Sequence, residues 1–252
     1  MVRVLMHGCC GAMGRVITGL AADREDLKIV AGVDRNTDDS LGYPVFQSLE
    51  ACDVEVDAII DFTAAPAVDH LLDYCAEKKV PVVLCSTGLS DAQMAKVSES
   101  AKKVAVLRSA NMSLGVNLLL KLVQEAAKVL ASSGFDIEIV EKHHNQKKDA
   151  PSGTALALAE SMNEALGNQY HYVYDRSSVH EKRDPKEIGI ASVRGGSIVG
   201  DHDVIFAGKD EVITFNHTAY SKAIFAKGAL EAAKFLAGKE PGLYDMSNVV
   251  QL

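Results

Sequence analysis

Residues 2–15 read VRVLMHGCCGAMGR, an apolar run that ends in a turn where Gly8, Gly11 and Gly14 recur every third residue. The apolar run predicts a short buried strand, and the residues after the turn predict a helix. Cys9 stands where the usual G-x-G-x-x-G motif has its first glycine, so the spacing alone is weak evidence. The turn lies between a strand and a helix, as the motif requires, because a pyrophosphate binds the free N–H groups of the helix N-terminus. The stretch therefore predicts a dinucleotide-binding βαβ unit.

The first hundred residues alternate short β-branched runs with longer helical stretches. Near-continuous apolar strands separated by helices are typical of a parallel sheet that is covered on both faces. We therefore expect an α/β fold with a Rossmann-type, doubly wound parallel sheet. The predicted strands cover residues 2–6, 28–33, 57–62, 80–84 and 104–107, and the predicted helices cover 15–22, 67–78 and 91–102.

From residue 113 onward, strands follow one another without helices between them, which predicts an α+β domain with a mixed or antiparallel sheet. Its helices are predicted at 114–131 and 154–166, and its strands at 135–141, 189–194, 203–207 and 212–218. The polar, poorly periodic stretch 168–187 predicts a long surface loop. A final helix over 222–236 is expected to return to the first sheet. The expected domains are thus 1–112 together with 222–252, which bind the dinucleotide, and 113–221.

Composition limits the classes to which the protein can belong. With 252 residues, 48% of them hydrophobic and 24% charged, the chain has the length and composition of one or two globular domains. The net charge of −8 argues against a nucleic-acid binder, and the lack of an apolar run of about 18 residues argues against a membrane span. Five cysteines without a CxxC pair predict reduced thiols, and the N-terminus lacks a signal-peptide pattern. We therefore expect a cytoplasmic protein.

Two charged residues after the second predicted strand bear on the choice of dinucleotide. Asp34 lies 20 residues beyond Gly14, where a carboxylate can accept hydrogen bonds from ribose hydroxyls. Arg35 beside it has the charge to pair with a 2′-phosphate, so both NADH and NADPH are possible cofactors. The alternative is that the glycine turn is a tight strand-to-helix turn that binds no ligand. Ligands of doubly wound sheets bind along the carboxyl edge. Small and polar residues gather there in Asp61-Phe62-Thr63, Cys85-Ser86-Thr87-Gly88 and Ser109-Ala110-Asn111-Met112-Ser113.

Residues 141–154 read EKHHNQKKDAPSGT and gather two histidines, two lysines and the start of a helix. His143 and His144 are adjacent on a strand end, so their side chains point to opposite sides and at most one faces a given reacting atom. Lys147 and the donors of residues 152–154 suit the binding of a carboxylate, and a His or Lys here can donate a proton during a reduction. The alternatives are a solvated basic loop and a metal site. No metal is expected, because the histidines have no nearby cysteine or spaced acidic partner.

These motifs and others across nearly the whole chain resemble the 4-hydroxy-tetrahydrodipicolinate reductase family, also called the dihydrodipicolinate reductase family. The most specific match is the stretch Lys147-Lys148-Asp149-Ala150-Pro151-Ser152-Gly153-Thr154-Ala155 after the histidine pair. The other matching segments are 8–15, 60–63, 86–88, 110–117, 141–144, 192–196, 198–202 and 242–246.

The resemblance implies a pyridine-nucleotide reductase of diaminopimelate and lysine biosynthesis, in which NADH or NADPH reduces a cyclic unsaturated dicarboxylate. It also implies a homotetramer built through the sheet of domain 113–221, which binds the substrate. His143 and Lys147 match the family's proton-donor positions. The positions that match its substrate contacts are His144, Ser152, Gly153 and Thr154. The positions that match its cofactor contacts are Gly8, Cys9, Cys10, Gly11, Ala12, Met13, Asp34, Cys85, Ser86, Thr87, Ala110, Asn111 and Met112, and Arg35 matches a position that favours NADP.

Two segments depart from the family pattern. A cofactor loop that often reads Gly-Thr-Thr-Gly is Cys85-Ser86-Thr87-Gly88 here, and Ala64-Ala65-Pro66 stands where some relatives carry an arginine. Both departures bear on cofactor affinity and leave the reaction class intact. Two other interpretations stay open. One is an aldehyde-dehydrogenase-like enzyme with Cys85 as nucleophile, and the other is a nucleotide-sensing binding module, which has no need for His143 and Lys147.

Overall fold

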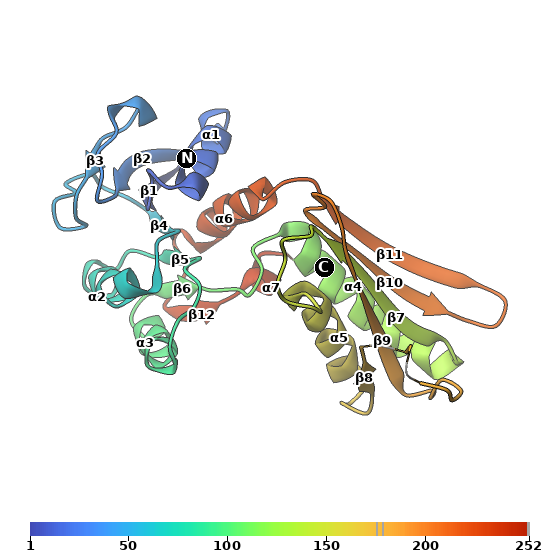
Figure 1. Cartoon of the computed structure of the whole chain (residues 1–252). Coiled ribbons are helices and arrows are strands. Elements are labelled where there is room, and N and C mark those ends of the chain that lie inside the picture. Colours follow the sequence, from blue (N-terminus) through green and yellow to red (C-terminus); the bar gives the residue numbers. More distant parts are fainter. Residues whose placement is uncertain (175, 178, 251–252) are drawn as a thin grey trace. The chain divides into compact units, whose positions relative to one another are not determined.

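The computed structural model describes residues 1–174, 176–177 and 179–250, and the chain divides into two compact units. Unit 1 combines Met1–Leu114 with Ala223–Leu252, and unit 2 is Gly115–Lys222 (Figure 1). The expected fold class is confirmed, because unit 1 carries a parallel sheet with helices and unit 2 carries a mixed sheet.

Seven short strands form the sheet of unit 1. They are β1 (Val2–His7), β2 (Leu27–Val33), β3 (Val45–Phe46), β4 (Ala58–Asp61), β5 (Val82–Leu84), β6 (Ala105–Leu107) and β12 (Gly242–Tyr244). They pair in parallel in the order β12-β6-β5-β4-β1-β2-β3. The helices are α1 (Ala12–Ala22), α2 (Val68–Lys78), α3 (Asp91–Ala101), α6 (Ala223–Leu236) and α7 (Met246–Val249), with short 3-10 helices η1 (Asp39–Leu41) and η2 (Ala65–Ala67). The sequence pattern predicts neither β3, β12 nor α7, because such short elements show no period.

Unit 1 buries side chains on both faces of its sheet. On β1, Val4 and Met6 belong to one core and Leu5 belongs to the other, as the alternation of a strand requires. The first core includes residues of α1 and α6, and the second includes residues of α2 and α3. Because each face packs against helices, strands that are apolar on both faces are stable here.

A five-stranded mixed sheet forms the centre of unit 2. Its elements are α4 (Leu114–Leu130), η3 (Ala131–Ser133), β7 (Asp136–His143), α5 (Gly153–Ala165), β8 (His171–Val173), β9 (Glu187–Arg194), β10 (Gly200–Ala207) and β11 (Val212–Ala219). The strand order is β11-β10-β7-β9-β8. Strand β10 runs antiparallel to β11 and β7, and strand β9 runs parallel to β7 and β8. The prediction of a surface loop over 168–187 is wrong in part, because this stretch contains β8. The three residues of β8 show no apolar period that could have predicted a strand. Residues 175 and 178 of that stretch lie outside the described residues.

Helices α4 and α5 pack on one face of this sheet (Figure 1). Along β7 the buried side chains are Ile137, Ile139, Glu141 and His143, and the side chains between them are half-buried. The alternation that buries the isoleucines therefore also buries a carboxylate and an imidazole, whose residues are 0% and 8% exposed. Buried polar groups require partners, so this end of β7 must hold a polar network.

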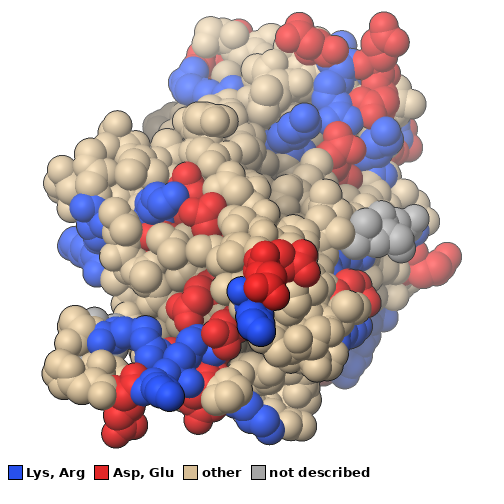
Figure 2. Space-filling view, turned by 90° about the vertical axis from the view of Figure 1, so that its right-hand side faces the viewer, with Lys and Arg blue, Asp and Glu red and all other residues tan. Residues whose placement is uncertain are grey.

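Charged side chains on the face shown in Figure 2 form mixed clusters, in which Lys and Arg lie beside Asp and Glu. Among the described helices, none combines the length and the apolar character that a bilayer crossing needs.

Two helical glycines provide a matched test of packing in unit 1. An added Cβ at Gly228 in α6 would lie 1.6 Å from the carbonyl oxygen of Met112, whereas a Cβ at Gly19 in α1 would meet no described neighbour within 4 Å. We expect Gly228→Ala to lower the free energy of unfolding by about 2 kcal/mol or more, because the backbone must move. Gly19→Ala should raise it by up to about 1 kcal/mol, because alanine is the better helix former. Urea unfolding checks both, and a Gly228→Ala variant as stable as the wild type would contradict the close contact.

Candidate active site

The glycine turn of unit 1 brings the end of β1 close to the start of α1. Gly8 has a φ of +86°, and a Cβ there would lie 2.9 Å from the carbonyl oxygen of Phe62. A Cβ at Gly14 would lie 2.3 Å from the carbonyl oxygen of Gly8. Gly11 is the N-cap residue of α1 and provides no side-chain cap. The helix therefore presents its first backbone N–H groups without a capping side chain, which suits an anion.

Asp34 and Arg35 lie beside this turn, immediately after β2. The Asp34 carboxylate accepts hydrogen bonds from the backbone N–H groups of Cys10 and Asn36, at 3.0 and 3.2 Å. The bond to Cys10 fixes the carboxylate against the glycine turn. The structure therefore places Asp34 beside the glycine turn.

A cavity of about 500 Å³ opens at this point of unit 1. It is lined by His7, Gly8, Gly11, Val33, Asp34, Arg35, Gln47, Ser48, Leu49, Phe62, Thr63, Ala64, Pro66, Ala67 and His70. Of the predicted cofactor residues, the wall includes Gly8, Gly11, Asp34 and Arg35. The other residues of the turn, 9–10 and 12–13, lie outside the wall. A cradle that a Cβ would fill, an open helix N-terminus and a carboxylate held beside the turn together fit a dinucleotide.

A buried carboxylate joins three strand ends at the same edge of the sheet. Asp61 is fully buried, and its carboxylate contacts Nδ1 of His7 at 2.8 Å, Oγ1 of Thr63 at 2.7 Å and Oγ of Ser86 at 2.6 Å. The sequence pattern does not single out His7, although this residue lines the cavity. Its place at the carboxyl end of β1, next to Gly8, is the signal that could have identified it.

The remaining predicted cofactor residues lie at neighbouring strand ends of unit 1. Residues 85–87 follow β5 and residues 110–112 follow β6, and within the described residues neither group lines the cavity. Burial raises the pKa of the Cys85 thiol well above its ordinary value, and the Asp61 carboxylate adds to this effect. A thiol with a raised pKa is a poor nucleophile at neutral pH, which argues against the aldehyde-dehydrogenase-like interpretation.

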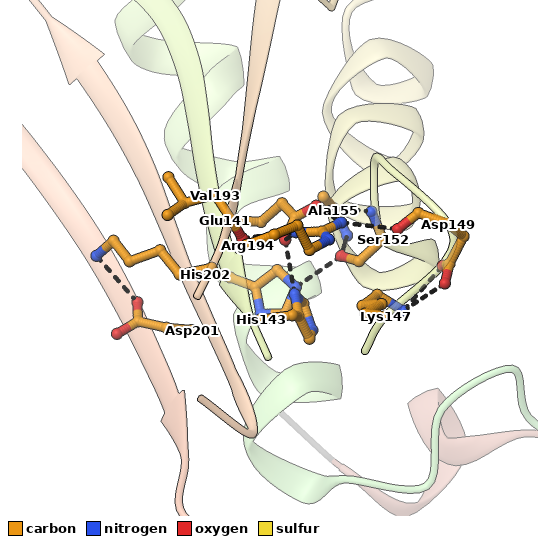
Figure 3. A network of polar contacts seen from close by, with 11 residues as sticks. Glu141, His143, Lys147, Asp149, Ser152, Ala155, Val193, Arg194, Asp201 and His202 are labelled. Carbon is orange, nitrogen blue, oxygen red and sulfur yellow. Dashed lines mark hydrogen bonds and ion pairs between the residues drawn. The ribbon is translucent and has the colours of Figure 1, made fainter. Parts of the chain in front are cut away.

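In unit 2, Glu141 lies at the centre of a buried polar network (Figure 3). Its carboxylate accepts hydrogen bonds from the two Nη atoms of Arg194 at 2.6 and 2.7 Å. It also contacts Nδ1 of His143 at 2.6 Å and the backbone N–H of Ser152 at 3.0 Å. Charge-assisted, bidentate bonds of this kind are among the strongest that proteins form, so the carboxylate is held firmly in place.

These contacts keep Glu141 ionised and fix the tautomer of His143. Burial raises the pKa of Glu141, but the hydrogen bonds from Arg194 and His143 outweigh it and bring the pKa to about 2. A carboxylate only accepts hydrogen bonds, so Nδ1 of His143 carries a proton. Its other nitrogen, Nε2, lies beside Gly200, where an added Cβ would come within 3.2 Å. The nitrogen that is left for a substrate is therefore Nε2, and the glycine leaves space next to it.

Ser152 connects the network to α5. It is the N-cap residue of that helix, and its Oγ accepts a hydrogen bond from the backbone N–H of Ala155 at 3.2 Å. The same oxygen lies 2.9 Å from Nε2 of His202, whose ring packs edge-to-face against His143 at a centroid distance of 5.1 Å. Burial lowers the pKa of His202 to about 4, with a smaller effect from His143, so this ring is neutral near pH 7. This neutral ring packs against His143 and adds no positive charge to the network.

Lys147 lies in the loop between β7 and α5, and its ammonium pairs with the Asp149 carboxylate at 2.8 and 2.9 Å (Figure 3). Arg194 donates a hydrogen bond to the backbone carbonyl of Asp149 at 2.7 Å, which ties the loop to the network. His144 is half-buried at the start of the loop, and residues 153–154 open α5 at its end. The loop thus brings the predicted catalytic and substrate residues to one end of β7.

Three residues of the network are not identified by the sequence pattern as site residues: Glu141, Arg194 and His202. The alternation of β7 gives one signal, because Glu141 stands two residues before His143 and so shares its face. The other two depend on strand register, since His202 lies opposite Glu141 on β10 and Arg194 lies opposite His143 on β9. Without that register, no sequence spacing points to them.

Comparison with known proteins gives matches to both units. The family model described as dihydrodipicolinate reductase, N-terminus, matches residues 2–112, and the model of the C-terminus matches residues 115–250. A 4-hydroxy-tetrahydrodipicolinate reductase of Caldanaerobacter subterraneus subsp. tengcongensis is 53% identical over 251 residues, which cover 100% of this chain and 99% of the relative. A 4-hydroxy-tetrahydrodipicolinate reductase of Clostridium tetani is 48% identical over 98% of this chain and 96% of its own length.

A solved structure extends the match to the fold. Dihydrodipicolinate reductase from Paenisporosarcina sp. TG-14, solved with dipicolinate bound, has a TM-score of 0.83 and 25% sequence identity. The match covers 99% of this chain and 100% of that one. The sequence resemblance is confirmed over both units, and the chain belongs to the dihydrodipicolinate reductase family of NAD(P)H-dependent oxidoreductases.

Proposed function

We propose that the chain reduces 4-hydroxy-tetrahydrodipicolinate to tetrahydrodipicolinate, in diaminopimelate and lysine biosynthesis, with the nucleotide in unit 1 and the substrate in unit 2. The observation that carries this proposal is the buried pair of Glu141 and His143, which orients an imidazole in the segment that also holds Lys147. A nucleotide-sensing module has no use for such a pair. A cationic loop that leads into a helix N-terminus also suits a dicarboxylate.

Each residue of the loop receives a role from its contacts. NADH or NADPH, when bound, supplies the hydride. His143, held through Nδ1 by Glu141, presents Nε2, which gives a proton to the substrate when the ring carries protons on both nitrogens. Lys147 exchanges its partner Asp149 for a substrate carboxylate and supports the same proton transfer. The N–H and hydroxyl groups of residues 152–154 and the ring of His144 bind the rest of the substrate.

On the nucleotide side, the backbone of residues 8–13 binds the pyrophosphate at the start of α1. Asp34 accepts hydrogen bonds from ribose hydroxyls, and Arg35 provides the charge for a 2′-phosphate. Residues 85–87 and 110–112 complete the contacts at the carboxyl edge of the sheet. The shape of the glycine turn and the cavity beside it support this assignment.

Arg35 is expected to discriminate between the two nucleotides. Arg35→Ala should weaken NADPH binding about 10-fold or more, because a charge-assisted hydrogen bond contributes about 1.5–3 kcal/mol. NADH, which lacks the 2′-phosphate, should bind the variant as it binds the wild type. Lys28→Ala, which removes a positive charge from the exposed side of β2, is the matched control and should bind both nucleotides normally. Calorimetric titration measures the affinities, and equal losses for NADH and NADPH would exclude a phosphate contact.

We further propose that the chain forms a homotetramer through the sheet of unit 2, in the cytoplasm. The face of that sheet opposite α4 and α5 carries Val193 and Val212, which are 45% and 62% exposed. Further copies of the chain on this face would remove these side chains from water. The five cysteines are free thiols, as in a reducing compartment. Analytical ultracentrifugation should give the mass of four chains, and the mass of one chain would overturn the assembly.

Calorimetric titration with dipicolinate, a stable planar dicarboxylate, tests the assignment of two sites. We expect dipicolinate to bind the nucleotide-loaded protein, and Lys147→Ala to weaken dipicolinate binding while nucleotide affinity is retained. A nucleotide sensor would bind the nucleotide and show no second site. Failure of dipicolinate to bind in the presence of either nucleotide would overturn the proposed substrate site.

A further inference from the structure

Cys9, Cys10 and Asp34 come together at the glycine turn. The Sγ atoms of the two cysteines lie 3.9 Å apart, and one ligand atom from each of the three residues lies within 4.8 Å of the others. Among the residues that the structure describes, this is the one group of His, Cys, Asp or Glu with such spacing. The sequence contains no CxxC pair, so the adjacent cysteines alone do not predict a metal site. The fold adds the carboxylate from the end of β2.

The spacing of the sulfurs matches that of two thiolates on one metal ion. A tetrahedral zinc with Zn–S bonds of about 2.3 Å places its sulfurs about 3.8 Å apart. A carboxylate oxygen completes a set of three protein ligands, and water takes the fourth position, as in open zinc sites. Two thiolates make the site soft, which favours Zn²⁺ or Cd²⁺ over Mg²⁺ or Ca²⁺.

The surroundings of the two thiols define how an ion would reach them. Cys9 is fully buried, and its Sγ lies where a Cβ at Gly32 would come within 2.6 Å, so this sulfur faces inward. Cys10 is half-buried, and its Sγ lies 3.2 Å from the carbonyl oxygen of Asn36. An ion therefore arrives from the side of Cys10.

The charge of such a site is compatible with its neighbours. Two thiolates and a carboxylate around a divalent ion carry one net negative charge. Arg15 lies close by, because its Nε donates a hydrogen bond to the carbonyl oxygen of Cys10 at 3.2 Å. Asp38 pairs with the same guanidinium at 2.6 Å and holds it next to the turn.

We propose that Cys9, Cys10 and Asp34 bind a thiophilic divalent cation, Zn²⁺ or Cd²⁺, and that this ion and the nucleotide exclude each other. Each thiol releases its proton to solvent as its sulfur–metal bond forms, and no electron changes hands. The exclusion rests on the proposed function, because Asp34 is the carboxylate assigned to the ribose hydroxyls. An ion bound to Asp34 occupies a carboxylate oxygen that the ribose hydroxyls would need. The ion also lies against the turn that would hold the pyrophosphate. The chain thereby acquires a metal-sensitive block at its nucleotide site.

The test is a titration of the reduced, full-length protein with Cd²⁺ alone, followed by the ultraviolet thiolate-to-cadmium charge-transfer absorption. We expect one Cd²⁺ per chain for the wild type and for the control Cys52→Ser, which removes a thiol elsewhere in unit 1. Cys10→Ser and Asp34→Asn should weaken Cd²⁺ binding at least about 10-fold, since even outer-shell changes cost that much. Circular dichroism verifies that each variant is folded. Unchanged Cd²⁺ affinity in both folded variants would overturn the site.

A second titration tests the mutual exclusion. With NADH or NADPH present, the apparent affinity of the wild type for Cd²⁺ should fall in proportion to the nucleotide concentration. Nucleotide binding without metal is measured separately. If the nucleotide binds but leaves Cd²⁺ affinity unchanged, the exclusion is wrong. If neither nucleotide binds the metal-free protein, the proposed function fails, and the metal site is still judged by the variants.

Discussion

Replacing His143 by alanine is expected to lower kcat about 10²–10⁴-fold, the usual contribution of a positioned proton donor. The ring is held by the Glu141 carboxylate at 2.6 Å and leaves Nε2 for the substrate, so the substitution removes the group that transfers the proton. Nucleotide affinity should not change, because the cavity assigned to the nucleotide belongs to unit 1. Steady-state kinetics and nucleotide titration measure the two quantities independently.

The two adjacent lysines give this prediction a matched control. Lys147→Ala should also lower kcat by about 10²-fold or more and raise KM, because Lys147 contributes to both proton transfer and carboxylate binding. Lys148→Ala removes the same charge from the exposed neighbour and should behave as the wild type. Equal kinetics for the two lysine variants, or loss of nucleotide binding in His143→Ala, would show that the roles are misplaced.

Glu141→Gln is expected to lower the free energy of unfolding by about 3–5 kcal/mol, the range for breaking a buried ion pair. The amide cannot balance the Arg194 guanidinium, and it removes an acceptor from Nδ1 of His143. Glu138→Gln on the same strand is the control, because Glu138 pairs with Arg183 on the opposite, half-buried side. That change should cost about 1 kcal/mol or less. Urea unfolding of the two variants compares them directly, and equal losses would contradict the central place of Glu141.

The same carboxylate makes stability depend on pH. In the folded chain its pKa is about 2, below its ordinary value, because Arg194 and His143 donate to it. A carboxyl of this kind stabilises the fold above its unfolded pKa, and the stabilisation is lost as the pH falls toward the folded pKa. The stability difference between wild type and Glu141→Gln should therefore shrink as the pH is lowered from about 5 toward 2. A difference that stays constant over this range would show that folding does not lower the pKa of Glu141.

Much of the fold is predictable from local patterns. Val4, Leu5 and Met6 form a strand with two buried faces, and such strands separated by helices are typical of a parallel sheet that is covered on both faces. Strand β8 is different, because its three residues pair through their backbone at the sheet edge and have no apolar period. Its existence depends on pairing with β9, and no local pattern reveals that pairing.

The residues of the candidate site also fall into those that local sequence predicts and those that depend on strand pairing. Gly8 and Asp34 are predictable because the turn and the strand that follows have a fixed geometry along the chain. Arg194 lies 53 residues from Glu141 in sequence, and only the register of β7 with β9 brings them together. The meeting of Asp34 with the two cysteines likewise requires the pairing of β1 with β2. Long-range pairing is thus what the sequence alone leaves undetermined.

The most direct test of the reductase assignment is the absorbance of the reduced nicotinamide in a coupled reaction. Pyruvate, aspartate semialdehyde and the preceding synthase generate the substrate, and the wild-type chain is then added with NADH or NADPH. We expect the absorbance to fall with at least one nucleotide, and to fall about 100-fold more slowly, or slower still, with His143→Ala. No loss of absorbance with either nucleotide, or a His143→Ala variant as fast as the wild type, would contradict the proposed site.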